Sequence, residues 1–399
     1  MGHMTTEELI GAAHRYLFGN YRRFPIVLTR GQGARVWDSD GREYLDFLAG
    51  IAVCSLGHSH PRVVAAIREQ AEILTHVSNL YYIEPQIRLA GLLVENSFAD
   101  RVFFCNSGAE AIEGAIKLAR RFAHERMEGH RYEIITMENS FHGRTLAAVT
   151  ATAQKKYHEG FEPLPGGFRY VPFDDMAALA AAVTENTCGV LVEPIQGEGG
   201  IRIPSPGYLR ELRNFCDERG ILLLFDEVQA GMGRTGHLFA YEEWGVEPDI
   251  MTLAKALGNG YPLGALLARE HIASVFVPGT HASTFGGNPL GMAAGIAVME
   301  TLLEKGTLEH CRAMGNYLRS GLETLKNDHE TVREVRGKGL MVGMELAGPG
   351  DDAVLKAMKK GLLINCTGGN VLRFVPPFVI TEADVDRAVE ILDEVLKEG

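Results

Sequence analysis

Two stretches decide the fold of this chain: Ile221-Leu222-Leu223-Leu224-Phe225-Asp226-Glu227-Val228-Gln229 and Asp249-Ile250-Met251-Thr252-Leu253-Ala254-Lys255-Ala256-Leu257-Gly258. Each contains an apolar run of the kind that forms a strand buried on both faces, and each places a charged residue where that run ends. Burying an unpaired charge is costly. We therefore expect Asp226 and Lys255 to face a ligand-filled cleft at the carboxyl edge of one sheet.

Pyridoxal phosphate is a ligand that would satisfy both residues. Its aldehyde condenses with a desolvated lysine amine, and its protonated ring nitrogen needs a carboxylate partner. Taken singly, each residue also has an ordinary interpretation, because Asp226 could be a helix N-cap or half of an ion pair and Lys255 could extend to solvent. Their joint position at one sheet edge favours the cofactor.

The composition is that of an ordinary globular protein with room for two domains, since 46% of its 399 residues are hydrophobic and 23% are charged. A net charge of −12 without any basic tract disfavours nucleic acid and anionic membranes as partners. The six cysteines form no CxxC pair, which fits a reducing cytoplasm. No apolar stretch reaches the roughly 18 residues that a membrane-spanning helix needs.

Between about residues 101 and 268, apolar runs alternate with helical patterns, which predicts an α/β fold with a mostly parallel sheet covered by helices. We expect strands at 102–105, 133–137, 188–192, 221–225, 250–253 and 263–268, and helices at 108–127 and 206–219.

After Gly286-Gly287-Asn288-Pro289 the pattern changes to that of a smaller α+β domain. It has a long helical stretch at 290–327, strands at 331–336 and 340–346, a helix, a strand pair at 361–365 and 371–375, and a final helix. The first sixty residues contain two short strands about a turn at 35–47. We expect an N-terminal segment (1–60) that packs with the small domain, a large cofactor-binding domain (61–288) and the small domain (289–399).

Two further loops could carry binding groups. Asn106-Ser107-Gly108-Ala109-Glu110 joins a strand to a helix, so the free amides of the helix start could bind an anion, although Ser107 with Glu110 is also a plain capping box. Phe141-His142-Gly143-Arg144-Thr145 offers a ring that could stack on a heterocycle and a guanidinium that could bind a carboxylate, although it could also be an ordinary surface loop.

Glu198 and Arg373 form a possible pair. Glu198 follows the buried run 188–192 within Glu193–Gly200, and Arg373 lies inside the apolar strand Val371–Val375, where its charge needs a partner. A substrate carboxylate or Glu198 would serve. Gly231–Gly236 matches GxGxxG but does not open a helix directly after a strand, so we reject a dinucleotide site. No HExxH, GxxxxGK[ST] or GxSxG motif occurs, and no metal site is expected.

From about Tyr16 to Leu396 the chain resembles the class III (ornithine-type) aminotransferases, which have pyridoxal-phosphate-dependent transferase fold type I. The stretches that carry the resemblance are Gly50–Val53, Leu56–His58, Ser78–Tyr82, Asn106–Glu110, Phe141–Thr145, Glu193–Gly199, Asp226–Gln229, Gly233–Gly236, the lysine segment and His281–Pro289.

The resemblance implies a role for each matching residue. Lys255 would bond covalently to the cofactor and then move a proton between Cα of the substrate and C4′ of the cofactor. Asp226 would pair with the pyridine nitrogen, Gln229 would approach the phenolic oxygen and Phe141 would stack on the ring. The phosphate would be held by Ser107, Gly108 and Ala109.

The same resemblance implies a homodimer with shared sites, in which Thr284 reaches the phosphate in the neighbouring subunit. Ser283 would lie with it at the substrate site. Arg144 and Arg373 would bind substrate carboxylates, and Glu198 would neutralise Arg373 whenever a substrate brings no second carboxylate to it.

The implied reaction moves the terminal amino group of N2-acetyl-L-ornithine to 2-oxoglutarate, giving N-acetyl-L-glutamate 5-semialdehyde and L-glutamate in arginine biosynthesis. Succinylornithine, N-succinyl-diaminopimelate, ornithine and 4-aminobutyrate stay open as donors, with glutamate-semialdehyde aminomutase activity a more distant alternative. A cofactor-free binding protein on the same scaffold is the alternative from another class. Cys54, Ile112 and Ala230 depart from the usual pattern, and Cys54 bears on substrate preference.

Overall fold

The computed structural model describes residues 4–398, and its largest element is a seven-stranded sheet with strand order β4-β10-β9-β8-β7-β5-β6. The strands from β9 to β6 are parallel to their neighbours, whereas β10 is antiparallel to both β4 and β9. The predicted α/β class with a mostly parallel sheet is therefore confirmed. The strands are β4 (Arg101–Cys105), β5 (Glu133–Met137), β6 (Phe168–Val171), β7 (Thr187–Val192), β8 (Leu222–Asp226), β9 (Ile250–Leu253) and β10 (Gly264–Ala268).

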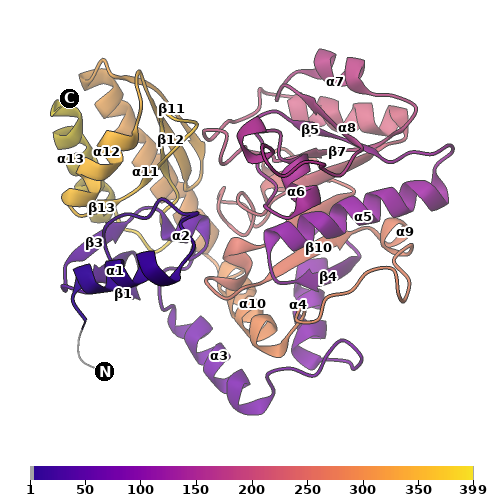
Figure 1. Ribbon diagram of the computed structural model, residues 1–399, viewed down its shortest axis with the longest axis horizontal. Helices are drawn as coiled ribbons and strands as arrows, with labels where there is room; N and C mark the ends of the chain where they lie inside the picture. Colours follow the sequence, from indigo (N-terminus) through magenta and orange to yellow (C-terminus); the bar gives the residue numbers. More distant parts are fainter. Residues whose placement is uncertain (1–3, 399) are drawn as a thin grey trace.

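Helices pack against this sheet, and the central strands β7, β8 and β9 are buried throughout. On the sheet itself lie α5, which contacts β9 and β10, α8, which contacts β8, and α7, which contacts β6. Figure 1 shows α3, α4 and α10 as a separate group below it, and α10 packs on the other two. These helices are α3 (Pro61–Ile73), α4 (Glu84–Glu95), α5 (Gly108–Arg126), α6 (Leu146–Ala151), α7 (Met176–Ala182), α8 (Tyr208–Arg219), α9 (Glu270–Ala273) and α10 (Pro289–Leu302).

The C-terminal part has its own antiparallel sheet with strand order β11-β12-β15-β14. Its strands are β11 (Val332–Lys338), β12 (Met341–Leu346), β14 (Asn365–Thr367) and β15 (Val371–Phe374), and its helices are α11 (Thr307–Asp328), α12 (Asp351–Lys359) and α13 (Glu382–Lys397). The helical stretch expected at 290–327 is two helices, α10 and α11. The break falls at Gly306, whose φ of +99° is incompatible with a continuing right-handed helix.

A third sheet joins the two ends of the chain, with strand order β1-β2-β3-β13. Its strands are β1 (Leu28–Gln32), β2 (Arg35–Asp38), β3 (Glu43–Asp46) and β13 (Leu362–Leu363), and α1 (Thr6–Tyr16) precedes them. The pair β3 and β13 is parallel, and Figure 1 shows the N-terminal strands beside the C-terminal helices. The single strand expected at 361–365 is therefore wrong: β13 joins this sheet and β14 joins the C-terminal one.

Strands β1 and β6 were not predicted, because neither has an apolar run. The strand β6 reads Phe-Arg-Tyr-Val at the sheet edge and is half exposed, and β1 is mostly polar and exposed. The division into 1–60, 61–288 and 289–399 stays a prediction. None of the helices between residues 4 and 398 is long and apolar enough to cross a membrane.

Candidate active site

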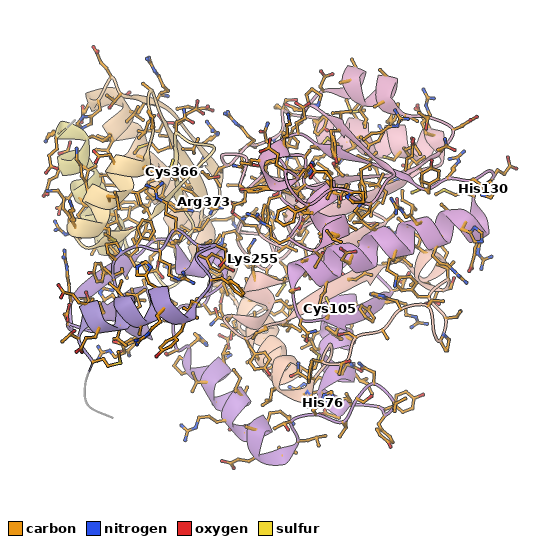
Figure 2. The ribbon with its side chains drawn as sticks, viewed as in Figure 1. His76, Cys105, His130, Lys255, Cys366 and Arg373 are labelled. Atoms are coloured by element: carbon orange, nitrogen blue, oxygen red, sulfur yellow. The ribbon has the colours of Figure 1, made fainter. Side chains whose placement is uncertain are left out.

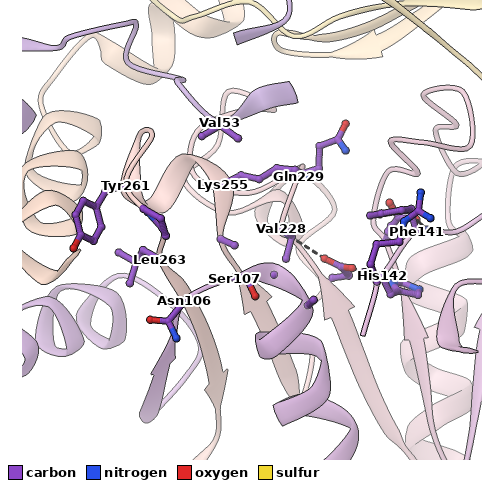
Figure 3. Close-up of a pocket in the computed structure, with 18 of the residues that line it drawn as sticks. Val53, Asn106, Ser107, Phe141, His142, Val228, Gln229, Lys255, Tyr261 and Leu263 are labelled. Carbon is purple, nitrogen blue, oxygen red and sulfur yellow. Dashed lines mark hydrogen bonds and ion pairs between the residues drawn. The ribbon is translucent and has the colours of Figure 1, made fainter. Parts of the chain in front are cut away.

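The carboxyl ends of the central strands open into a cavity of about 390 Å³ (Figure 3). Because parallel strands end at the same edge, residues that follow β4, β5, β7, β8 and β9 meet there. The cavity is lined by Val53, Asn106, Ser107, Gly108, Ala109, Phe141, His142, Gly143, Arg144, Glu193, Asp226, Val228, Gln229, Ala254, Lys255, Gly260, Tyr261, Pro262 and Leu263. Eight of the residues predicted from the sequence are thus brought together: Ser107, Gly108, Ala109, Phe141, Arg144, Asp226, Gln229 and Lys255.

Asp226, at the end of β8, is buried and held by two close contacts. Its Oδ2 lies 2.7 Å from Nδ1 of His142, and its Oδ1 accepts a hydrogen bond from the Val228 amide at 3.0 Å. Since His142 is itself buried, the pair fixes both the position and the orientation of the carboxylate. Sequence reasoning gave His142 no role, although its place between Phe141 and Arg144, after the end of β5, puts it at the edge where Asp226 lies.

A second carboxyl group, Glu193, lies behind this pair at the end of β7. It accepts hydrogen bonds from the amides of Phe141 (3.1 Å) and Gly197 (3.2 Å). Burial raises the pKa of Glu193 to about 7, against the opposing effect of His142. Glu193 therefore connects the Phe141 segment to the loop after β7.

Lys255 follows β9 with a φ of +41°, a left-handed conformation that is strained for a lysine. Its amine is enclosed by protein and opens into the cavity. Burial lowers the pKa of Lys255, although the carboxylates of Glu198 and Asp226 oppose the shift. A lowered pKa increases the fraction of uncharged amine, the form that attacks a carbonyl carbon.

The first turn of α5 lines the opposite side of the cavity. Ser107 is its N-cap, and the Ser107 Oγ accepts a hydrogen bond from the Glu110 amide at 3.2 Å. Glu110 bonds back to Asn106 through the backbone amide at 2.5 Å and the side-chain nitrogen at 3.0 Å. The glutamate is thus directed one residue before the serine, and residues 107–109 remain at the cavity with the positive end of the helix dipole.

Arg373, on β15, is fully buried beside Lys255 (Figure 2). Its Nη1 donates to Oε1 of Glu198 at 2.5 Å and to Oε1 of Gln229 at 3.1 Å, and its Nε donates to Oδ1 of Asn365 at 3.1 Å. Burial alone would raise the pKa of Glu198, but the adjacent Arg373 charge outweighs it and the pKa is lowered. The structure therefore brings Glu198, Gln229 and Arg373 into one contact network, and Gln229 connects it to the cavity.

Arg144 lies on the exposed side of the cavity, with its guanidinium 3.9 Å from the centre of the Tyr157 ring and 5.4 Å from that of Phe141. Stacking on two rings orients the guanidinium and leaves its edge free to bind a carboxylate.

Four predicted residues lie outside the cavity lining of this single chain: Glu198 and Arg373, which reach it through Gln229, and Thr284 and Ser283. Thr284 is exposed, and Ser283 is partly buried next to α5, where its Oγ accepts hydrogen bonds from Gly286 N (2.9 Å) and Asn106 Nδ2 (3.3 Å). Of the three residues that depart from the usual family pattern, Ile112 and Ala230 are buried in the core. Cys54 lies near the cavity, with its Sγ 3.6 Å from the position that a Gly260 Cβ would take.

This arrangement fits pyridoxal phosphate. It provides a desolvated amine, a buried carboxylate held by a histidine and a backbone amide, an aromatic ring and a helix start for a phosphate. Two buried nitrogens near these groups, Arg373 Nη2 and His142 Nε2, have no hydrogen-bond partner within residues 4–398. Fold and site together define a pyridoxal-phosphate-dependent aminotransferase.

The chain belongs to the class III aminotransferases: the family described as "Aminotransferase class-III" matches residues 17–396. It is 58% identical to the acetylornithine aminotransferase of Caldanaerobacter subterraneus subsp. tengcongensis, over 96% of this chain and 98% of the relative. It is 51% identical to the acetylornithine aminotransferase of Methanocaldococcus jannaschii, over 99% of each chain.

Solved structures agree on the fold. The ornithine aminotransferase of Toxoplasma gondii superimposes with a TM-score of 0.95 at 37% identity, covering 99% of this chain and 96% of that one. The N-acetylornithine aminotransferase of Stenotrophomonas maltophilia superimposes with a TM-score of 0.84 at 40% identity, covering 98% of both chains. Class III aminotransferases depend on pyridoxal phosphate, and so does this one.

Proposed function

We propose that this enzyme transfers the terminal amino group of N2-acetyl-L-ornithine to 2-oxoglutarate in the cytoplasm, as a step of arginine biosynthesis. The observation that carries the proposal is the Glu198–Arg373 pair beside Lys255. An aminotransferase must accept two substrates in one site, and here they differ in the number of carboxylates. The Arg373 guanidinium can serve both substrates if Glu198 pairs with it in one case and turns away in the other. The names of the relatives at 51–58% identity support the same donor.

The cofactor would be held by residues at the ends of three strands, β4, β5 and β8. Asp226, oriented by His142, would keep a proton on the ring nitrogen of the cofactor, and Phe141 would cover one face of the cofactor ring. Ser107, Gly108 and Ala109 would bind its phosphate. When bound, the cofactor supplies an aldehyde that accepts the amino group and a ring that stabilises negative charge on the carbon that loses its proton.

The chain's own residues would do the rest. The uncharged Lys255 amine, favoured by its lowered pKa, would take a proton from the donor carbon and return it on the cofactor side. Arg144 would bind the carboxylate of the donor. With 2-oxoglutarate, Arg144 and Arg373 would bind one carboxylate each, and Glu198 would turn away.

A homodimer is part of the proposal. Leu80 and Tyr82, between α3 and α4, are 84% and 97% exposed, and Phe285 next to Thr284 is 61% exposed. Large apolar side chains so exposed are typical of an interface. A second copy of the chain there would bring its Thr284 towards the phosphate site. Sedimentation analysis of the enzyme should give twice the mass of one chain.

Two experiments test the function. Initial rates with 2-oxoglutarate and acetylornithine, succinylornithine, ornithine or 4-aminobutyrate should give the highest kcat/KM for acetylornithine. A clear preference for another donor would refute the assignment.

The second experiment is Lys255→Ala, which should remove nearly all turnover while the protein still binds pyridoxal phosphate noncovalently. Borohydride should fix the cofactor to Lys255 in the wild type and to no residue in the variant. A labelled peptide that lacks Lys255 would contradict the role.

A further inference from the structure

The segment that carries Glu198 is a closed loop, Gln196–Arg202, here called the Glu198 loop. The backbones of Gln196 and Arg202 exchange two hydrogen bonds, 3.1 and 3.0 Å long, which close its base. The side chain of Gln196 also donates to Glu138 O at 2.9 Å. Because its base is fixed in this way, the position of Glu198 depends on what holds the tip of the loop.

The tip rests on one row of the C-terminal sheet. In that row Arg336 on β11 is opposite Gly343 on β12, Gly343 is opposite Arg373 on β15, and Arg373 is opposite Asn365 on β14. Residues directly opposite in antiparallel strands project from the same face. Arg336, Gly343 and Arg373 therefore meet the loop side by side.

Arg336 binds the loop backbone. It is buried, and its Nε donates to Gly200 O at 3.1 Å and to Ile201 O at 3.0 Å, while its Nη2 donates to Gly200 O at 2.7 Å. Its Nη1 bonds to Glu334 at 2.5 Å and to Glu345 at 2.7 Å. Acids on its own sheet thus balance its charge, and its other donors hold two loop carbonyls.

Gly343 makes room for a strained residue. Ile201 has a φ of +51°, a left-handed conformation that is unfavourable for a β-branched side chain. A Cβ on Gly343 would lie 3.0 Å from both the Ile201 Cβ and the Val371 Cγ1, so a larger residue there would push these neighbours away by a few tenths of an ångström. Such strain persists only where the surroundings hold it. Arg336 and the space at Gly343 do so.

Thr367, at the end of β14, makes the third contact: its hydroxyl donates to the carbonyl oxygen of Glu198 itself. Glu198 also lines a second cavity of about 500 Å³, together with Asn139, Gln154, Arg202 and Asn370. The Glu198 side chain thus has polar space to turn into, while its backbone is fixed.

Resting on the proposed function, we propose that Arg336 and Thr367 are positioning residues that fix the Glu198 loop on the sheet that carries Arg373, so that Glu198 releases Arg373 by side-chain rotation alone. A donor with one carboxylate needs Glu198 on Arg373, because the buried guanidinium otherwise stays unpaired. Glutamate and 2-oxoglutarate bring their own carboxylate. Loosening the loop therefore impairs the first class of substrate and spares the second.

The test compares single-turnover half-reactions of the holoenzyme with acetylornithine and with glutamate. Thr367→Val, which keeps the shape but loses the hydroxyl, should lower kcat/KM for acetylornithine about tenfold, the cost of one buried hydrogen bond, and change that for glutamate less than about twofold. Arg336→Gln should lower the ratio of kcat/KM for acetylornithine to kcat/KM for glutamate further than Thr367→Val does. Thr367→Ser keeps the hydroxyl and should restore the ratio.

If Arg336 and Thr367 were purely structural, the variants would lower kcat/KM for acetylornithine and for glutamate together, and that result would overturn the proposal. An unchanged ratio of the two kcat/KM values in Thr367→Val would also overturn it. Gly343→Ala supplies an independent variant, since it displaces Ile201 without removing a hydrogen bond and should shift the ratio as well. If the wild type prefers another donor with a single carboxylate, the proposed substrate is wrong. The same ratio, measured with that donor, then still decides the role of the loop.

Discussion

Among the described residues two arginines are completely buried, Arg373 next to Glu198 and Arg234 at the junction of the chain's parts. All the partners of Arg373 are side chains, whereas two of the three partners of Arg234 are backbone carbonyls. Arg373 is held by side chains, those of Glu198, Gln229 and Asn365. Arg234 donates to the backbone oxygens of Leu340 (3.0 Å) and Pro376 (2.6 Å) and to Ser55 Oγ (2.7 Å). Side chains can rotate away, whereas backbone carbonyls cannot.

The comparison shows how one residue type serves two purposes. Burial lowers the pKa of Arg234 to about 10, so the group keeps its charge at neutral pH without any carboxylate. It thereby connects the loop after β8 to both the N-terminal segment and the C-terminal part, and we expect it to contribute stability. Under the proposed function a substrate carboxylate replaces the partner of Arg373, and we therefore expect Arg373 to contribute to catalysis.

The largest effect should come from Arg373→Met. It should lower kcat/KM for 2-oxoglutarate by about a thousandfold, because a carboxylate buried in the cavity would lose its charged partner. The free energy of unfolding should change little, since Glu198 can turn to the second cavity. Steady-state kinetics and urea unfolding of the same preparation measure both. A destabilisation as large as the catalytic loss would erase the distinction between the two arginines.

Arg234→Met should show the reverse behaviour. Removing three hydrogen bonds from buried acceptors should lower the free energy of unfolding by about 3 kcal/mol, while the folded enzyme keeps a kcat near that of the wild type. Urea unfolding with kinetics at low temperature would measure it. A severe loss of kcat in fully folded protein would show that Arg234 also acts on the site.

A buried carboxyl group, Glu227, should make the free energy of unfolding depend on pH. Glu227, next to Asp226, accepts hydrogen bonds from the amides of Ala240 (2.6 Å) and Tyr241 (2.7 Å), and burial raises its pKa to about 8. Between the unfolded value of 4.5 and about 8 the folded state holds a proton that the unfolded state has lost, so stability falls as the pH rises.

Glu227→Gln should abolish this part of the slope, roughly 3–4 kcal/mol between pH 5 and 8. The measurement is the urea midpoint of both proteins at several pH values between 5 and 8. Parallel curves for wild type and variant would show that Glu227 is ionised in the folded state.

An exposed arginine completes the series with the smallest effect. Arg387 pairs with Glu390 on the surface of α13 at 3.1 Å, and both side chains are more than half exposed. Arg387→Ala should change the free energy of unfolding by less than about 0.5 kcal/mol and leave kinetics unchanged. A larger change in the free energy of unfolding would mean that the charge of an arginine, and not its burial, decides how much it stabilises this protein.

The sequence was sufficient for the parts of the site that are local. Asp226 and Lys255 follow apolar runs, so both the strands and their charged ends could be predicted, and the parallel sheet then required the two to meet. Glu198 and Arg373 were recognised because a charge in an apolar strand needs a partner. The resemblance supplied their roles, which no periodicity indicates.

What could not be predicted depends on register and on contacts between distant segments. The row that joins Arg336 to Arg373 requires the pairing of three strands, and His142 gains its partner only when β5 and β8 lie in the same sheet. The sequence shows Arg234 only as part of a glycine-rich turn, because two of its acceptors are backbone carbonyls and the third, Ser55, lies far away along the chain.

The parallel pairing of β3 with β13 has a consequence for how the protein is made. Residues 43–46 leave the ribosome early, but the strand that completes their sheet, Leu362–Leu363, is translated more than three hundred residues later. Pairing over such a separation is slow and leaves an open strand edge exposed during synthesis. The nascent chain should therefore depend on chaperone protection of this edge until translation is nearly finished.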